Sequence, residues 1–174
     1  MTVTVSASPH GLCQTSALAT LPPGIDMSVS VVVINGPSLN LLGQRDPAFY
    51  GTDTLGDIER LCRVEAERLG LDVEFFQSNH EGALIDRVQE AFTRRQAVVI
   101  NAAGYSHTSI ALMDALELLS MPVVEVHLSD INSREEFRRH SYISLVAAEV
   151  IVGKGGAGYL LALQQVARLT NRDG

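Results

Sequence analysis

Near the start of the chain stands a run of β-branched residues, Val29-Ser30-Val31-Val32-Val33-Ile34-Asn35. Its apolar residues follow one another without strict alternation. This pattern is typical of a strand that is buried on both faces, as the strands of a parallel sheet are. We therefore predict that residues 29–35 form the first strand of an α/β fold.

Helices and strands are expected to alternate from this run onward. Thr54 and Asp57 resemble a capping box with Asp in place of Glu, and apolar residues then recur at helical spacing until Gly70. The later strands are expected at Leu71–Phe76, Ala97–Asn101, Val123–His127 and Glu149–Val152, and the later helices at Glu81–Thr93, Thr108–Leu119 and Gly156–Leu169. Strands separated mostly by helices imply a three-layer α/β sandwich around a five-stranded parallel sheet with right-handed crossovers.

The length and composition indicate one domain preceded by an extension. A chain of 174 residues can bury a single core without disulfide or metal staples. Residues 1–26 carry scattered Ser, Thr, Pro and Gly, with no basic start and no continuous apolar stretch. We expect them to be a disordered N-terminal extension rather than a signal peptide, with the domain over residues 27–174.

Charge and cysteine content exclude several classes of function. The net charge of −7 argues against general nucleic-acid binding, because no basic face is available to neutralise several phosphates. Cys13 and Cys62 match no metal-ligand spacing and are expected to be reduced thiols. No apolar run approaches the roughly 20 residues that span a bilayer. We expect a soluble, cytoplasmic protein with no metal site, whose positive contacts to an anionic ligand are local.

Polar side chains collect where the predicted strands end. Asn35 follows the first strand, residues 77–80 follow the second, Asn101 ends the third, and His127 with Ser129 ends the fourth. Parallel α/β sheets bind ligands at the carboxyl ends of their strands. Polar residues also cap strands that have no function, but four such positions together favour a binding site at this edge.

The connection over residues 36–53 has no apolar periodicity, and its 18 residues exceed the usual length of a loop between strand and helix. We expect it to be a lid or a binding loop. It carries Arg45 and Tyr50, and an arginine beside a tyrosine stabilises the phenolate and lowers the tyrosine pKa from about 10.

Five blocks of sequence resemble the successive signatures of type II 3-dehydroquinate dehydratase, also called type II dehydroquinase. The blocks are residues 35–43, 45–50, 101–109, 125–129 and 134–141, within a resemblance that covers residues 29–169. The resemblance implies a flavodoxin-like fold with strand order 2-1-3-4-5, a dodecamer built from trimers, and no cofactor. It also implies dehydration of 3-dehydroquinate to 3-dehydroshikimate through an enolate, in either the shikimate pathway or quinate breakdown.

The resemblance also implies the roles of the reacting groups. Tyr50 matches the base that removes the C2 proton, and Arg45 matches the arginine that lowers the pKa of this base. His127 matches the residue that protonates the departing C1 hydroxyl, with help from Asn101. Glu125 is expected to form an orienting pair with His107 behind the site.

The substrate-binding residues follow from the same resemblance. The substrate carboxylate is expected on the backbone amides of Leu128 and Ser129 and on the Ser129 hydroxyl. Arg138 and His107 match residues that hold ring hydroxyls, and Asp114 matches a residue offered across the trimer interface. Arg134, Arg138 and Arg139 can also be explained as a solvated run of charge, which we expect for Arg139.

One position departs from the family pattern. Where the family has Asn-Gly-Pro-Asn, the chain has Asn35-Gly36-Pro37-Ser38. The second asparagine of the family is thought to hold the water or oxyanion that stabilises the enolate. A serine hydroxyl is shorter and has one donor proton where an amide has two, so enolate stabilisation is expected to be weaker here.

Two other functions fit part of the sequence. Residues 153–158 match G-x-G-x-x-G, the dinucleotide fingerprint, but they open the last helix rather than the first, so tight packing explains the glycines better. A flavin-binding module of flavodoxin type is the related alternative. A non-enzymatic relative is the second, and Ser38 together with the N-terminal extension motivates it.

Overall fold

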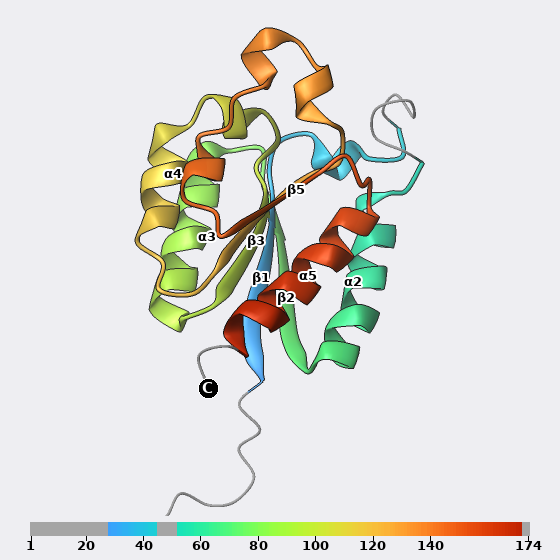
Figure 1. Cartoon of the computed structure of the whole chain (residues 1–174), viewed down its shortest axis with the longest axis vertical. Helices are drawn as coiled ribbons and strands as arrows, with labels where there is room; N and C mark the ends of the chain where they lie inside the picture. The colour runs from blue at the N-terminus through green and yellow to red at the C-terminus, as the bar shows by residue number, and fades with distance from the viewer. Residues whose placement is uncertain (1–27, 45–51, 172–174) are drawn as a thin grey trace, which may run out of the picture.

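The computed structural model describes residues 28–44 and 52–171. Five parallel strands form one sheet in the order β2-β1-β3-β4-β5 (Figure 1). They are β1 (Val29–Asn35), β2 (Leu71–Gln77), β3 (Ala97–Asn101), β4 (Val123–His127) and β5 (Glu149–Val152). The predicted strand order and the flavodoxin-like architecture are confirmed.

Helices cover both faces of this sheet, as Figure 1 shows. Helices α2 (Leu55–Leu69) and α5 (Ala157–Thr170) pack on one face, and α3 (Glu81–Arg94) and α4 (Ile110–Glu117) pack on the other. Strand β1 explains why both faces are apolar, because Val31 and Val33 join one core cluster while Val32 and Ile34 join the other. All four side chains are fully buried.

The predicted start of α2 is confirmed in detail. The Thr54 hydroxyl accepts the backbone N–H of Asp57, and the Asp57 carboxylate accepts the N–H of Thr54, which completes the capping box. Gly70 ends the helix in the left-handed conformation, with φ of 69°.

Helix α4 is shorter than the predicted span of residues 108–119. Ser109 caps it, since its hydroxyl accepts the Leu112 N–H at 2.9 Å, and Thr108 belongs to the turn before. Residues 103–107 form a 3₁₀ helix that was not predicted. The predicted helix ran too far at its C-terminal end because Leu118 and Leu119 continue the apolar pattern, and at its start the Ser109 cap places the first helical residue at Ile110.

The segment between β4 and β5 contains three short 3₁₀ helices, Ile131–Ser133, Glu136–Arg138 and Ile143–Leu145. Figure 1 shows the first two rising above the carboxyl edge of the sheet. Such short pieces leave no periodic pattern in a sequence, which is why none of them was predicted.

The predicted lid begins as a packed turn. Leu39–Leu41 form a 3₁₀ helix, and Leu39 and Leu42 are each only 2% exposed. The first part of the connection is therefore anchored on the core. Arg45, Tyr50 and the predicted extension over residues 1–26 lie outside the described residues.

The glycine-rich segment before α5 serves close packing at one position at least. A Cβ atom on Gly158 would lie 3.3 Å from Cγ1 of Val126 in β4. This contact supports the packing explanation of the glycines. Among the described residues, no helix has the length and apolar character required to cross a membrane.

Candidate active site

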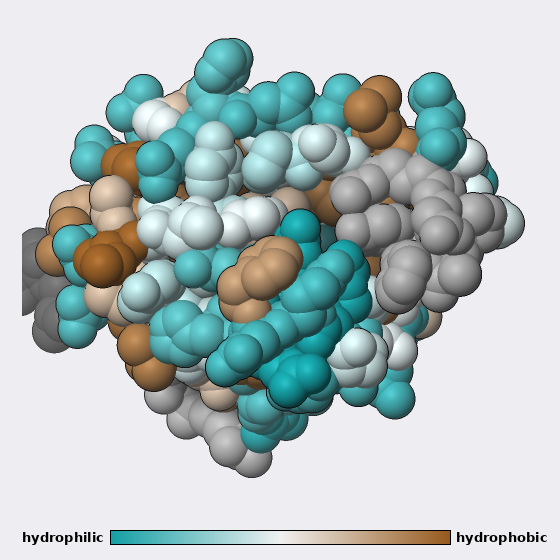
Figure 2. All heavy atoms as spheres, turned by 90° about the horizontal axis from the view of Figure 1, so that it is seen from above, coloured by the Kyte–Doolittle hydropathy of each residue, from teal (hydrophilic) through white to brown (hydrophobic). Residues whose placement is uncertain are grey.

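A cavity of about 240 Å³ lies at the carboxyl ends of β1, β3 and β4, below the 3₁₀ segments that follow β4. Figure 2 looks down on this end of the molecule, where the described surface is mostly hydrophilic. The polar side chains on the wall come from four separate stretches of sequence: Ser38; Asn101 and His107; His127 and Ser129; and Arg134 and Arg138.

Most of the predicted site residues meet on this wall. Ser38, Asn101, His107, His127, Leu128, Ser129 and Arg138 all line the cavity. Asp114 is exposed on α4 and does not line it. The side chains of Arg45 and Tyr50 lie outside the described residues, so their predicted roles stay predictions.

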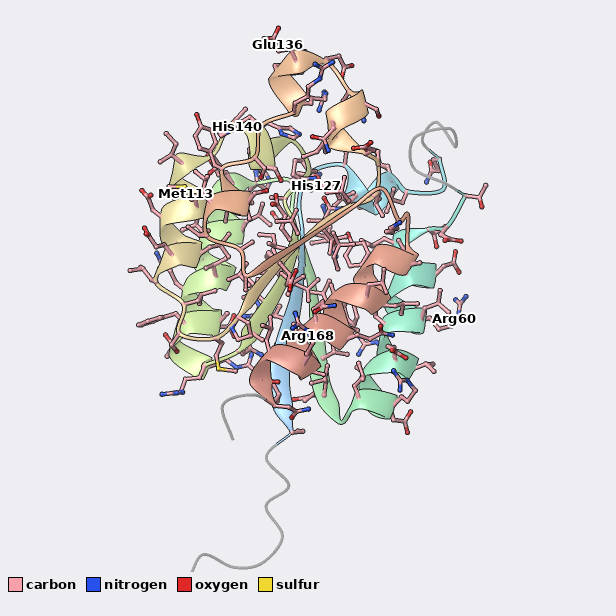
Figure 3. The ribbon with its side chains drawn as sticks, in the orientation of Figure 1. Arg60, Met113, His127, Glu136, His140 and Arg168 are labelled. Carbon is pink, nitrogen blue, oxygen red and sulfur yellow. The ribbon has the colours of Figure 1, made fainter. Side chains whose placement is uncertain are left out.

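The imidazole of His127 is held by a buried carboxylate. Its Nε2 lies 2.9 Å from Oε1 of Glu125, and the two residues are 5% and 0% exposed. The Ser141 hydroxyl donates to the same oxygen at 2.6 Å, and the Ser144 hydroxyl donates to Oε2. Figure 3 shows His127 near the carboxyl edge of the sheet. With Nε2 engaged, Nδ1 is the ring nitrogen left for a ligand.

Glu125 remains ionised although it is buried. Burial raises the pKa of this carboxyl, but hydrogen bonds from His127, Ser141 and Ser144 and the charge of His127 outweigh burial and hold the pKa below its ordinary value. A carboxylate behind an imidazole fixes the ring orientation and stabilises the imidazolium form. The structure thus gives His127 the support that a proton donor needs.

His107 has a different partner from the one expected. The resemblance suggested that Glu125 and His107 form a pair, but Nδ1 of His107 lies 2.7 Å from the backbone oxygen of His140. Its ring stacks on that of His127 with centroids 6.3 Å apart. Burial lowers the pKa of His107, and the nearby charges of His127 and Arg138 lower it further. A neutral ring that donates from Nδ1 leaves Nε2 as an acceptor for a ligand hydroxyl.

The amide of Asn101 is oriented from below by residues that were not predicted. Its Nδ2 donates to the Tyr159 hydroxyl at 3.1 Å, and that hydroxyl donates to Oδ1 of Asn35 at 2.6 Å. The backbone N–H of Ala103 donates to Oδ1 of Asn101 at 3.2 Å. Burial raises the pKa of Tyr159 well above its ordinary value, so its hydroxyl keeps its proton. In the sequence, Tyr159 stands within an apolar helical pattern, and nothing there indicates that its hydroxyl contacts Asn101.

Arg134 lies on the cavity wall, and the sequence analysis did not single it out as a site residue. Its side chain is 15% exposed, and Nη1 lies 3.4 Å from the Ser129 hydroxyl. Arg139 is exposed and does not line the cavity, in agreement with the expectation of a solvated charge. The spacing of Arg134, Arg138 and Arg139 in the sequence does not show which of them face the cavity, because residues 131–138 form two 3₁₀ turns instead of one helix.

The wall suits a small polar anion with several hydroxyl groups. Arg134 and Arg138 supply positive charge within an acidic chain, and the amide, imidazole and hydroxyl groups supply hydrogen bonds. Within residues 28–44 and 52–171, no cluster of three or more His, Cys, Asp or Glu side chains could hold a metal ion.

Comparisons with known proteins show which family the chain resembles. Residues 29–167 match the family described as Dehydroquinase class II. A 3-dehydroquinate dehydratase of Caulobacter sp. (strain K31) is 57% identical over 141 residues, which cover 81% of this chain and 96% of the relative. One from Bartonella henselae is 50% identical and covers 84% and 99%. The crystal structure of type II dehydroquinase from Propionibacterium acnes matches with a TM-score of 0.78 at 43% identity, covering 81% of this chain and 97% of that one.

Proposed function

The chain belongs to the class II dehydroquinase family and dehydrates 3-dehydroquinate, and from this premise we propose that the reaction takes place in the cavity lined by Ser38, Asn101 and His127. The enzyme is a hydro-lyase of the shikimate pathway. The observation that carries the proposal is the contact between His127 and the buried carboxylate of Glu125 on the wall of this cavity.

The elimination needs a base, a group that stabilises the enolate, and an acid for the departing water. Tyr50, assisted by Arg45, takes the proton from C2 of the substrate. His127 gives a proton to the C1 hydroxyl, which leaves as water, and Asn101 holds this group in place. The hydrogen bonds that keep His127 and Asn101 in fixed orientations support both roles.

The substrate lies with its carboxylate against Leu128 and Ser129 and its ring hydroxyls against His107 and Arg138. The stretch that follows β4 supports this orientation, because Gly153 and Gly155 donate backbone hydrogen bonds to the carbonyls of residues 127 and 128 and hold it in place. The arginines at the wall offset the negative charge of the chain locally. An acidic protein can in this way bind an acidic substrate.

The assembly that we propose is a dodecamer built from trimers, in the cytoplasm. Asp114 is exposed on α4, outside the cavity of its own chain, which leaves it available to a neighbouring subunit. Large apolar side chains also stand exposed at Leu118, Phe137 and Leu145, where 64%, 67% and 69% of their surface is accessible. Such exposed apolar side chains are suited to contacts between subunits.

The direct test of the function is to add 3-dehydroquinate to the purified protein and follow the ultraviolet absorbance of the conjugated enone product. We expect turnover without any added cofactor, and the rate should survive dialysis against EDTA because the proposed acid, base and enolate contact are all side chains. No enone formation, or activity that returns only when a divalent metal is added, would overturn the proposal.

Replacing Ser38 by asparagine is expected to raise kcat with a smaller change in KM. An enolate contact acts mainly in the transition state, and one lost donor costs about 10²–10³ in kcat, of which a serine recovers part. The backbone favours the change, because Ser38 has a φ of 64° and asparagine tolerates this left-handed region better than serine does. Steady-state kinetics measure kcat and KM of the wild-type protein and of Ser38→Asn, with both proteins in the same oligomeric state. An unchanged or lower kcat would show that enolate stabilisation is arranged differently here.

A further inference from the structure

Two residues on the cavity wall have an unfavourable backbone conformation. Among the described residues, Ser38, Arg95 and Ala103 are the non-glycine residues with positive φ, and Ser38 and Ala103 line the cavity. The values for these two are 64° and 51°. A side chain in the left-handed region costs free energy, so surrounding contacts must hold it there.

One contact that holds Ser38 comes from the turn that follows β2. The backbone N–H of Ser38 donates to Oδ1 of Asn79 at 2.9 Å. Asn79 is itself fixed twice, because Nε2 of Gln77 donates to its Oδ1 at 3.2 Å and the Tyr105 hydroxyl donates to its backbone oxygen at 3.0 Å. Gln77 also donates to the Gly36 carbonyl at 3.2 Å. Gln77 and Asn79 therefore form two hydrogen bonds with the turn over residues 36–38.

The opposite side of the turn lies close against the end of β3. Gly36 donates its N–H to the Asn101 carbonyl at 2.8 Å, and a Cβ atom at this position would lie 2.4 Å from the Ala102 oxygen. The turn over residues 36–38 is therefore pressed against β3 on one side. On the other side, the Ser38 N–H donates to Asn79, and the Ser38 carbonyl accepts the Leu41 N–H at 3.2 Å in the 3₁₀ turn.

We propose that Asn79 is a positioning residue for the dehydration, acting through Ser38. By accepting the Ser38 N–H, the Asn79 amide selects the left-handed conformation that keeps this serine on the cavity wall. Asn79 does not line the cavity itself, so it acts without touching the substrate. The proposal rests on the proposed function, in which Ser38 stabilises the enolate.

The test is a double-mutant cycle with Asn79→Ala and Ser38→Gly, measured as kcat and KM by enone absorbance. Glycine reaches the left-handed region without help and has no hydroxyl to place, so Ser38→Gly removes the need for positioning. We expect Asn79→Ala to lower kcat about tenfold in the Ser38 background, with KM nearly unchanged, and by less than about twofold together with Ser38→Gly.

His80→Ala is the matched control, because His80 is the next residue in the same turn, is exposed, and makes no cap hydrogen bond through its side chain. Its kcat should stay at the wild-type value, and thermal unfolding should show that all variants are folded. An equal loss of kcat from Asn79→Ala in both backgrounds would overturn the role of Asn79 alone. A wild-type kcat for Ser38→Gly would overturn the enolate contact of Ser38 together with the role of Asn79. Absence of turnover by the wild-type protein would overturn the proposed function as well.

Discussion

Tyr50→Phe is expected to lower kcat by about 10²–10⁴-fold, since the change removes the oxygen that takes the C2 proton and leaves the aromatic ring. The substrate carboxylate and ring hydroxyls have their proposed contacts elsewhere, on Ser129, His107 and Arg138, so KM should change much less. Initial rates of enone formation over a range of substrate concentrations measure both quantities.

The matched control for this variant is Tyr142→Phe. It removes the same oxygen from a tyrosine that does not line the cavity and whose ring packs edge-on against His140 at a centroid distance of 4.5 Å. This variant should keep the wild-type kcat. If Tyr50→Phe also kept most of it, Tyr50 would not be the base, and the segment that carries it would only cover the substrate.

His127→Ala is expected to have the second large effect, a loss of about 10²–10⁴-fold in kcat, because it removes the acid that protonates the leaving hydroxyl. It also leaves the buried Glu125 carboxylate without its imidazole partner, so the thermal unfolding midpoint should fall too. Circular dichroism and unfolding curves must therefore accompany the kinetics.

The Glu125→Gln variant tests how much the Glu125 carboxylate contributes to the function of His127, while His127 itself stays in place. This variant keeps the volume of the side chain and the imidazole of His127 but removes the negative charge of the carboxylate that contacts Nε2 of His127. Its kcat should lie between those of the wild-type protein and His127→Ala. Full activity of His127→Ala in a folded protein would assign the acid to another group.

The sheet could be predicted from the sequence because the central strands β1 and β3 are short, mostly apolar runs, and the other strands are short segments rich in Val, Ile and Phe. The bounds of β1, β3, β4 and β5 agree with the prediction, and β2 is one residue longer. Local hydrogen bonding was harder to foresee. The Ser109 cap shortened α4, and the 3₁₀ helix after β4 is capped by Asp130, whose side chain accepts the Asn132 N–H, a local contact that leaves no period in the sequence.

The position of the site was predictable for a topological reason, since the carboxyl ends of parallel strands meet at one edge. Asn101 and His127 lie where this rule places them. Contacts through the core were not predictable, and these include the Tyr159 hydroxyl under Asn101. Glu125 and His127 are two residues apart on β4, so the alternation of a strand does place them on one face. Arg134 was missed because burial of an arginine depends on how the segment folds over the cavity.

Covalent imine chemistry is the main alternative to direct enolate formation next to a ketone, and it needs a primary amine at the substrate. Lys154 is the only lysine in the chain. It is exposed after β5 and does not line the cavity. The residues at the cavity therefore favour direct elimination with no covalent intermediate.

The measurement that tests this mechanism most directly is treatment of the active protein with 3-dehydroquinate and sodium borohydride, followed by intact mass and an activity assay. Borohydride reduces an imine to a stable amine, so any covalent intermediate would be trapped on the chain. We predict an unchanged mass and an unchanged rate of enone formation relative to protein treated with borohydride alone. A mass increase equal to the reduced substrate adduct, located at Lys154 and accompanied by loss of activity, would contradict direct enolate formation.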